Sequence, residues 1–262
     1  MRNIFRGLVW LLPLSIFALG CNMPLGFLAT STLVPSSTPL PTATDTQQPT
    51  TTFTITPTPT PVLTATPGPP PTPAPPLALD TLELSFFDDF TDVDSGWDRL
   101  ENTHYQDDGY RIFIDMPRTR YWAKPYLNYE DVVVEVDARL AGGEADNALG
   151  LICKHQDEDN FYALMISSDG FFAIRKRFEG SELTLLTGAT FLPSEAILTS
   201  PDATNRLRAE CIGGALRLYV NQQPVAEVFD NDIAAGDVGL IASTFDADTT
   251  EILFDNFTVY VP

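Results

Sequence analysis

Short runs of alternating apolar and polar residues cover the chain from residue 82 to its end. In residues 132–140, Val132, Val134 and Val136 occupy one face, while Glu135 and Asp137 occupy the other. This period of two is typical of a β-strand with one buried face. Other such runs are residues 110–115, 171–178, 205–212, 215–220, 224–229, 238–243 and 252–261, and residues 160–167 are apolar on both faces, as expected of a central strand.

Turn sequences join these runs into hairpins. Asp169-Gly170 lies between residues 160–167 and 171–178, and Gly213-Gly214 lies between residues 205–212 and 215–220. Such pairs accept the positive φ values of a tight hairpin. Only residues 194–198 resemble a helix, and only for about one turn. We therefore expect an all-β fold, an antiparallel β-sandwich.

The first 79 residues differ from the rest. Arg2 and Arg6 precede an uncharged apolar stretch that ends at Gly20-Cys21, the layout of a secretory signal. The sequence Ala-Leu-Gly-Cys resembles a bacterial lipobox and predicts a signal peptide over residues 1–20 with lipidation at Cys21. An uncleaved anchor or simple secretion remain alternatives. The first two interpretations place the rest of the chain outside a bacterial cell, tethered to its membrane at the surface.

Threonine and proline dominate residues 31–76, with runs such as TPTPTP at residues 56–61. Such a segment has too little apolar surface to offset its ordering entropy, and its prolines favour extended backbone. The sequence therefore predicts a disordered stalk over residues 21–79 and a folded domain over residues 80–262.

Charged residues are unevenly distributed along the chain. Arg2, Arg6 and Asp45 are the only charged residues before residue 80, whereas the whole chain carries a formal net charge of −20. An acidic domain of this kind argues against a nucleic-acid partner and against docking on anionic lipid. Membrane contact is expected only through the lipid anchor.

Two cysteines remain once Cys21 is assigned to the anchor. Cys153 follows Leu149 and Leu151 on its strand face, and Cys211 follows Leu207 and Ala209. An even pair in an exported domain suggests a disulfide, with two buried free thiols as the alternative.

A set of short motifs resembles a known fold family. In chain order these motifs are residues 87–90 (FDDF), 96–97 (GW), 159–162 (DNFY), 169–170 (DG), 205–208 (NRLR), 218–221 (LYVN), 236–240 (GDVGL) and 254–257 (FDNF). Their order resembles the concanavalin A-like jelly rolls, particularly the branch of 3-keto-disaccharide hydrolase-like domains, and similar domains occur in bacterial surface lipoproteins. The resemblance covers residues 86–261. This fold hosts hydrolases, lectins and passive modules alike.

The resemblance also implies a metal site. Many such jelly rolls hold a structural Ca²⁺ between the opening segment and an Asp of the final strand, and Asp89 and Asp255 are the matching positions. Calcium prefers several carboxylate and carbonyl oxygens. The alternative is that these carboxylates are simply solvated. Trp97 is expected to be a structural plug, as in similar domains.

Catalytic signals are weak. Glu135 and Asp137 resemble part of the Glu-x-Asp-x-x-Glu core of family 16 glycoside hydrolases, but the third carboxylate is missing. On the polar face of a strand they are most simply exposed. His104 and His155 show no metal or triad spacing, and a loop histidine such as His155 is usually exposed.

Aromatic residues give the strongest indication of a ligand site. Tyr121, Trp122 and Tyr126 crowd together, and Tyr162 and Arg175 could add to a concave sheet face. The alternative, which the sequence favours for Trp122, is that these rings belong to the ordinary sandwich core and a strand edge. Sugar rings stack on aromatic faces while polar side chains bind their hydroxyls. The sequence favours a non-catalytic module that binds a glycan or another extracellular ligand, with a structural or adhesion module and a glycoside hydrolase-like enzyme as alternatives.

Overall fold

The computed structural model of the protein describes residues 73–262 except residues 108 and 247. The predicted signal peptide, Cys21 and most of the predicted stalk lie outside the described residues. The described part is almost entirely antiparallel β-strand, with a single 3₁₀ turn, η1 (Leu79–Thr81). None of its helices is long and apolar enough to span a membrane.

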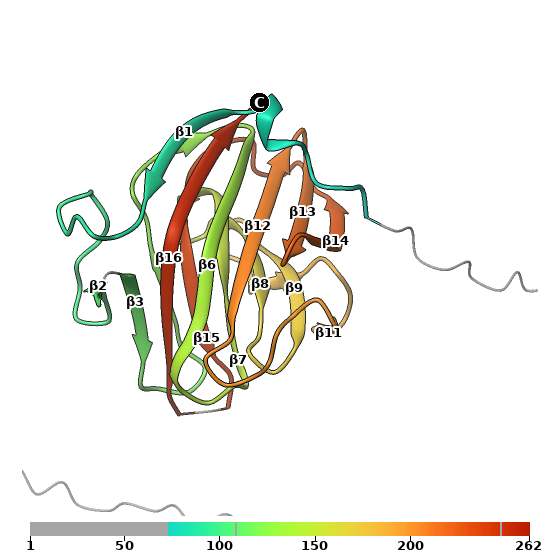
Figure 1. The fold of residues 1–262 in the computed structure, drawn as a ribbon. Helices are drawn as coiled ribbons and strands as arrows, with labels where there is room; N and C mark the ends of the chain where they lie inside the picture. Colours follow the sequence, from blue (N-terminus) through green and yellow to red (C-terminus); the bar gives the residue numbers. More distant parts are fainter. Residues whose placement is uncertain (1–72, 108, 247) are drawn as a thin grey trace, which may run out of the picture. The chain divides into compact units, whose positions relative to one another are not determined.

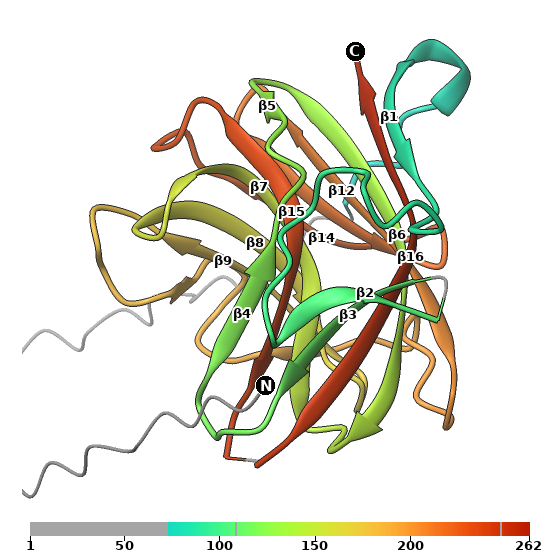
Figure 2. The same cartoon turned by 90° about the vertical axis from the view of Figure 1, so that its left-hand side faces the viewer.

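Sixteen strands form two sheets that face one another, and Figures 1 and 2 show the two layers. Sheet A runs in the order β14 (Gln223–Phe229), β13 (Ala215–Val220), β12 (Thr204–Ile212), β6 (Val132–Gly143), β16 (Thr250–Val261), β3 (Gly109–Ile114) and β2 (Thr103–Gln106), with β1 (Glu83–Asp88) also paired to β16. Sheet B runs in the order β10 (Thr184–Leu185), β9 (Phe171–Arg177), β8 (Asn160–Ile166), β7 (Asn147–Asp157), β15 (Gly236–Thr244) and β4 (Arg120–Ala123), with β11 (Leu192–Pro193) on β9 and β5 (Asn128–Tyr129) on β15.

The main hydrophobic core lies between the sheets. Val132, Val134 and Val136 point into it from β6, as their alternation with polar residues predicts. The hairpins at Gly170 and at Gly213-Gly214 are also confirmed, and all three glycines have positive φ. The fold is therefore the predicted jelly-roll β-sandwich.

A disulfide joins the two sheets across this core. Cys153 of β7 and Cys211 of β12 are bonded, 58 positions apart in sequence and with Cα atoms 6.7 Å apart. Both side chains are fully buried. The predicted disulfide is confirmed.

The predicted helical turn at residues 194–198 is not a helix. The segment forms a turn in which the Ile197 N–H donates to the Ser194 carbonyl. Asn205 then binds both backbone groups of Leu198, accepting from its N–H and donating to its carbonyl. A short helix is costly to nucleate, and these side-chain bonds stabilise a different local structure.

Part of the predicted stalk lies against the sandwich. The Arg208 guanidinium donates to the Leu77 carbonyl, Glu210 accepts from the Leu77 N–H, and the Tyr219 hydroxyl donates to the Ala74 carbonyl. These side chains come from the outer face of sheet A. Residues 73–79 therefore belong structurally with the sandwich, although composition alone placed them in the stalk.

Candidate ligand-binding site

The two faces of β4 separate the predicted aromatic residues. Successive side chains of a strand point to opposite faces. Tyr121 packs against the main core between the sheets, whereas Trp122 packs against an apolar cluster on the outer face of sheet B. The Trp122 ring lies 6.1 Å from Phe161 and 6.0 Å from His155, measured between ring centroids.

This outer apolar cluster explains why β8 is apolar on both faces. Its half-buried members include Trp122, Phe191 and Phe245. Its buried members are Ala148, Ile152, Phe161, Ala163, Met165, Leu183 and Ile241. The face that a sandwich usually presents to water is thus an apolar floor, partly covered by the segment that carries Leu183 and Phe191.

Polar side chains lie beside this apolar surface of sheet B. A pocket of about 180 Å³ opens among Arg120 of β4, Arg175 of β9 and Ser243 of β15, with Met165 and Phe245 beside them. In sheet B, β4 pairs with β15 at one edge, and β8 and β7 lie between β9 and β15 (Figure 2). The space suits one sugar ring or one substituent better than an extended chain.

His155 lies on the same face and is buried, with 3% of its surface exposed. The exposed position expected from the sequence is therefore wrong. The ring stacks on Phe161 at 5.5 Å, and its Nδ1 accepts from Lys124 Nζ at 3.2 Å. Burial, with the charge of Lys124 added, lowers the pKa of His155. Because the Lys124 ammonium can only donate, the neutral imidazole carries its proton on Nε2.

Unsatisfied polar atoms concentrate on this face. The described residues contain seven buried side-chain nitrogen or oxygen atoms that have no hydrogen-bond partner. Five of them belong to sheet B, namely Arg120 Nε, His155 Nε2, Arg175 Nε, Arg177 Nε and Ser243 Oγ. Buried polar groups are normally hydrogen-bonded, and each exception needs an explanation. A ligand that accepts hydrogen bonds from these atoms would explain why they have no partner within the protein.

Two of the five predicted ligand residues lie on this face, and a third lies next to it. Trp122 and Arg175 lie over the apolar cluster, and Tyr126 adjoins them through Lys124, whose Nζ is 5.1 Å from the Tyr126 ring. Tyr126 is 62% exposed, and its hydroxyl donates to Asp98. This arrangement leaves the Tyr126 ring available to a ligand.

Tyr121 and Tyr162 are not part of the site. Tyr162 is fully buried in the main core, and its hydroxyl donates to Asp230 at 2.5 Å. Tyr121 also packs against that core. Neither ring therefore packs in the outer cluster of sheet B. The sequence could not assign Tyr162 to a face, because β8 is apolar on both.

Glu135 and Asp137 lie on the other sheet, in β6. Arg206 forms ion pairs with Glu135 at 2.9 Å and with Asp137 at 3.3 Å, and Arg208 approaches Glu135 at 3.5 Å. These contacts hold the two carboxylates in a charge network on the outer face of sheet A. They do not line the sheet B pocket.

The predicted calcium ligands, Asp89 after β1 and Asp255 in β16, are close enough for their charges to interact. Burial raises the pKa of Asp255, and the charges of Asp137 and Asp89 add to that rise. Asp89 accepts from the N–H and hydroxyl of Thr91. Among residues 73–262, apart from 108 and 247, no three His, Cys, Asp or Glu side chains converge on one point. The calcium site stays a prediction.

Replacing Asp255 with asparagine tests this cluster. A carboxyl whose pKa is higher in the folded protein costs stability above its unfolded pKa of about 4, and that cost disappears at lower pH. We expect Asp255→Asn to raise Tm by on the order of 1–3 °C at pH 7 in EDTA, and not at pH 3. If Ca²⁺ binds there, Ca²⁺ stabilises the wild type but not the variant. An unchanged Tm at pH 7 in EDTA would contradict the electrostatic argument.

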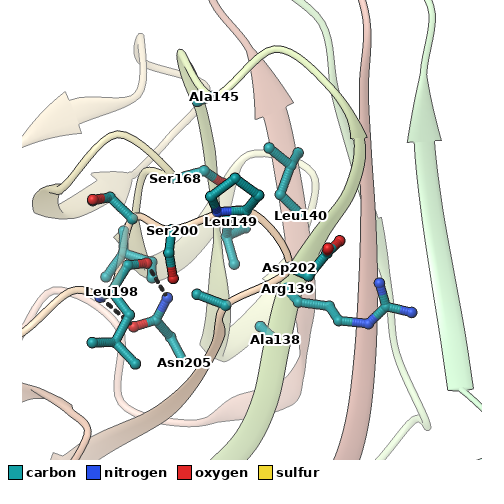
Figure 3. A pocket seen from close by; sticks show the side chains of 14 residues that line it. Ala138, Arg139, Leu140, Ala145, Leu149, Ser168, Leu198, Ser200, Asp202 and Asn205 are labelled. Carbon is teal, nitrogen blue, oxygen red and sulfur yellow. Dashed lines mark hydrogen bonds between the residues drawn. The ribbon is translucent and has the colours of Figure 1, made fainter.

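A second pocket, of about 200 Å³, lies at one end of the sandwich beside the segment 198–205. Figure 3 shows that Arg139 points away from it and that Asn205 is bonded to Leu198. Asn205 also accepts from Asn221. None of the unsatisfied buried atoms among the described residues lines this pocket. It is therefore a weaker candidate than the outer face of sheet B.

Comparison with known proteins supports the fold. No protein-family model and no curated protein matches the sequence. The carbohydrate-binding module CBM66 from Bacillus subtilis superposes with a TM-score of 0.51 at 17% identity, covering 63% of this chain and 94% of that one. SCLam, a non-specific endo-β-1,3(4)-glucanase of family GH16, gives a TM-score of 0.53 at 10% identity over 72% of this chain and 95% of that one.

An endo-β-1,3-glucanase from Pyrococcus furiosus superposes with a TM-score of 0.51 at 12% identity, over 69% of this chain and 94% of that one. At such identities the likeness concerns the fold. It agrees with the motifs at residues 87–90 and 254–257, which suggested the same fold. The described part of the chain has the concanavalin A-like jelly-roll fold.

Proposed function

We propose that the protein binds carbohydrate on the outer face of sheet B without catalysing a reaction on it. The observation that carries this proposal is the combination of an apolar floor and unsatisfied polar atoms on one face. Trp122 and Tyr126 offer aromatic surface to a sugar ring. Arg120, His155 and Ser243 offer hydrogen-bonding atoms that have no partner among the described residues.

The similar solved structures support this class of ligand without choosing between binding and hydrolysis. One is a carbohydrate-binding module and two are glucanases. Glycoside hydrolysis needs two free carboxyl groups on either side of the scissile bond. Glu135 and Asp137 are held in ion pairs on the opposite sheet, and Asp237, beside His155, pairs with Lys124 at 2.9 Å. These contacts favour carbohydrate binding over glycoside hydrolysis.

The proposed location is the bacterial cell surface. Lipidation of Cys21 would tether the chain, and the Thr/Pro-rich stalk would hold the sandwich away from the membrane. The disulfide between Cys153 and Cys211 is consistent with an oxidising compartment. The specific branch of 3-keto-disaccharide hydrolase-like domains is part of the same proposal and rests on the sequence motifs.

A glycan array probed with the full chain tests the proposal, with Ca²⁺ and with EDTA. We expect retention of one sugar class, and Trp122→Ala should weaken it by at least about tenfold through lost stacking. Phe229→Ala is the matched control, because Phe229 is 72% exposed on β14 of the other sheet. A blank array for the wild type would favour the structural or adhesion alternative. Equal retention by the Trp122 variant would place binding elsewhere.

A further inference from the structure

We infer that the outer face of sheet B recognises the anionic group of an acidic glycan, a carboxylate or a sulfate, through Arg120 and Arg175. This inference rests on the proposed function and names its substrate class. It starts from an imbalance of charge. The chain has a net charge of −20, yet Arg120, Arg175 and Arg177 project from this face.

The cations at this face differ in how well they are paired. Arg177 forms an ion pair with Asp159 at 2.9 Å, and Lys124 forms one with Asp237. Arg175 donates from Nη2 to the Leu183 carbonyl, a neutral acceptor. The Arg120 guanidinium makes no hydrogen bond or ion pair with any described residue. Glu182 is the one carboxylate whose negative charge raises the pKa of Arg120.

The guanidinium groups are also close enough to repel one another. Burial lowers the pKa of Arg120, and the charge of Arg177 lowers it further. The pKa of Arg175 is lowered by burial first and by Arg120 second. Like charges held together with few counter-charges are costly, and an anion placed between them would lower that cost.

The surroundings favour a strong contact with such an anion. Met165, Ile241 and Leu183 line the same pocket, and apolar walls strengthen charge-assisted hydrogen bonds. Ser243 lines the pocket and is only 8% exposed, and its hydroxyl has no hydrogen-bond partner among the described residues. A planar guanidinium can bind two oxygens of a carboxylate or sulfate at once. A neutral sugar could not offset the buried positive charge in this way.

Binding of the full chain to polygalacturonate and to its fully methyl-esterified form tests the inference, because the two polymers differ in charge and share their sugar rings. A sulfated galactan is tested as a second anionic polymer, and a neutral β-glucan is the uncharged control. We expect an anionic polymer to bind at least about tenfold more tightly than the neutral ones, with affinity falling as salt rises. Preference for the carboxylate or the sulfate arm identifies the group.

Arg120→Gln should weaken this binding by about 10- to 100-fold. Arg139→Gln removes the same charge from β6 of sheet A and should leave binding unchanged. Melting curves verify that both variants fold. Equal binding of acidic and neutral polymers, or equal binding by the two variants, would overturn the anion inference while leaving glycan binding intact. Failure of every polymer to bind would overturn both proposals.

Discussion

Replacing Cys153 and Cys211 together with alanine is expected to lower the free energy of unfolding by about 4 kcal/mol. The disulfide closes a loop of 58 residues and links β7 of sheet B to β12 of sheet A. Without it, the unfolded chain gains conformational freedom that the bond otherwise removes. Alanine is small enough to avoid overpacking at two fully buried positions.

Urea denaturation of the full chain measures this effect. The wild type in reductant is the matched control, and its unfolding midpoint should approach that of the double variant. The variant itself should not respond to reductant, and its Tm should fall by about 8–16 °C. An unchanged midpoint after both reduction and substitution would mean that the sheets hold together equally well without the bond.

Trp97→Ala is expected to cost about 3–5 kcal/mol, the range for losing a large buried aromatic side chain. Trp97 is 4% exposed, and its ring lies 5.2 Å from Phe90 and 4.8 Å from Phe257, measured between centroids. Its Nε1 also donates to Asp88 at 2.9 Å. The ring therefore closes one end of the core, as the motif at residues 96–97 predicted.

Trp97→Phe separates packing from hydrogen bonding. Phenylalanine retains most of the ring contacts and loses only the donor to Asp88, which still accepts from Phe90 N–H and from Ser95. We expect a cost of about 1–2 kcal/mol for this variant, measured by the same urea titration. A loss below about 1 kcal/mol for Trp97→Ala would contradict the plug role.

The sequence predicted the sandwich because one face of most strands is polar. In β6, Val132, Val134 and Val136 alternate with Glu135 and Asp137, and this contrast identified the buried face correctly. The same reasoning failed for β8, where Phe161 and Tyr162 are both fully buried on opposite faces. Burial on both faces removes the contrast that the pattern needs.

The candidate site was only partly predictable for a different reason. Arg120 and Arg175 belong to β4 and β9, which are far apart in sequence and have three strands between them in sheet B, yet both side chains line one pocket. His155 was expected to be exposed in a loop, but it follows Lys154, a residue with positive φ at an irregular part of β7. The break in alternation there turns His155 onto the buried outer face.

Hydroxyl-radical footprinting of the full chain, with and without the glycan that it retains, tests the central claim most directly. The account predicts slower oxidation of Trp122 and Tyr126 when glycan is bound, because Trp122 packs on the outer face of sheet B and the exposed Tyr126 ring lies beside Lys124. Phe229, exposed on sheet A, should oxidise at the same rate in both samples. Protection of Phe229 with no change at Trp122 and Tyr126 would place the glycan on the other sheet and contradict the account.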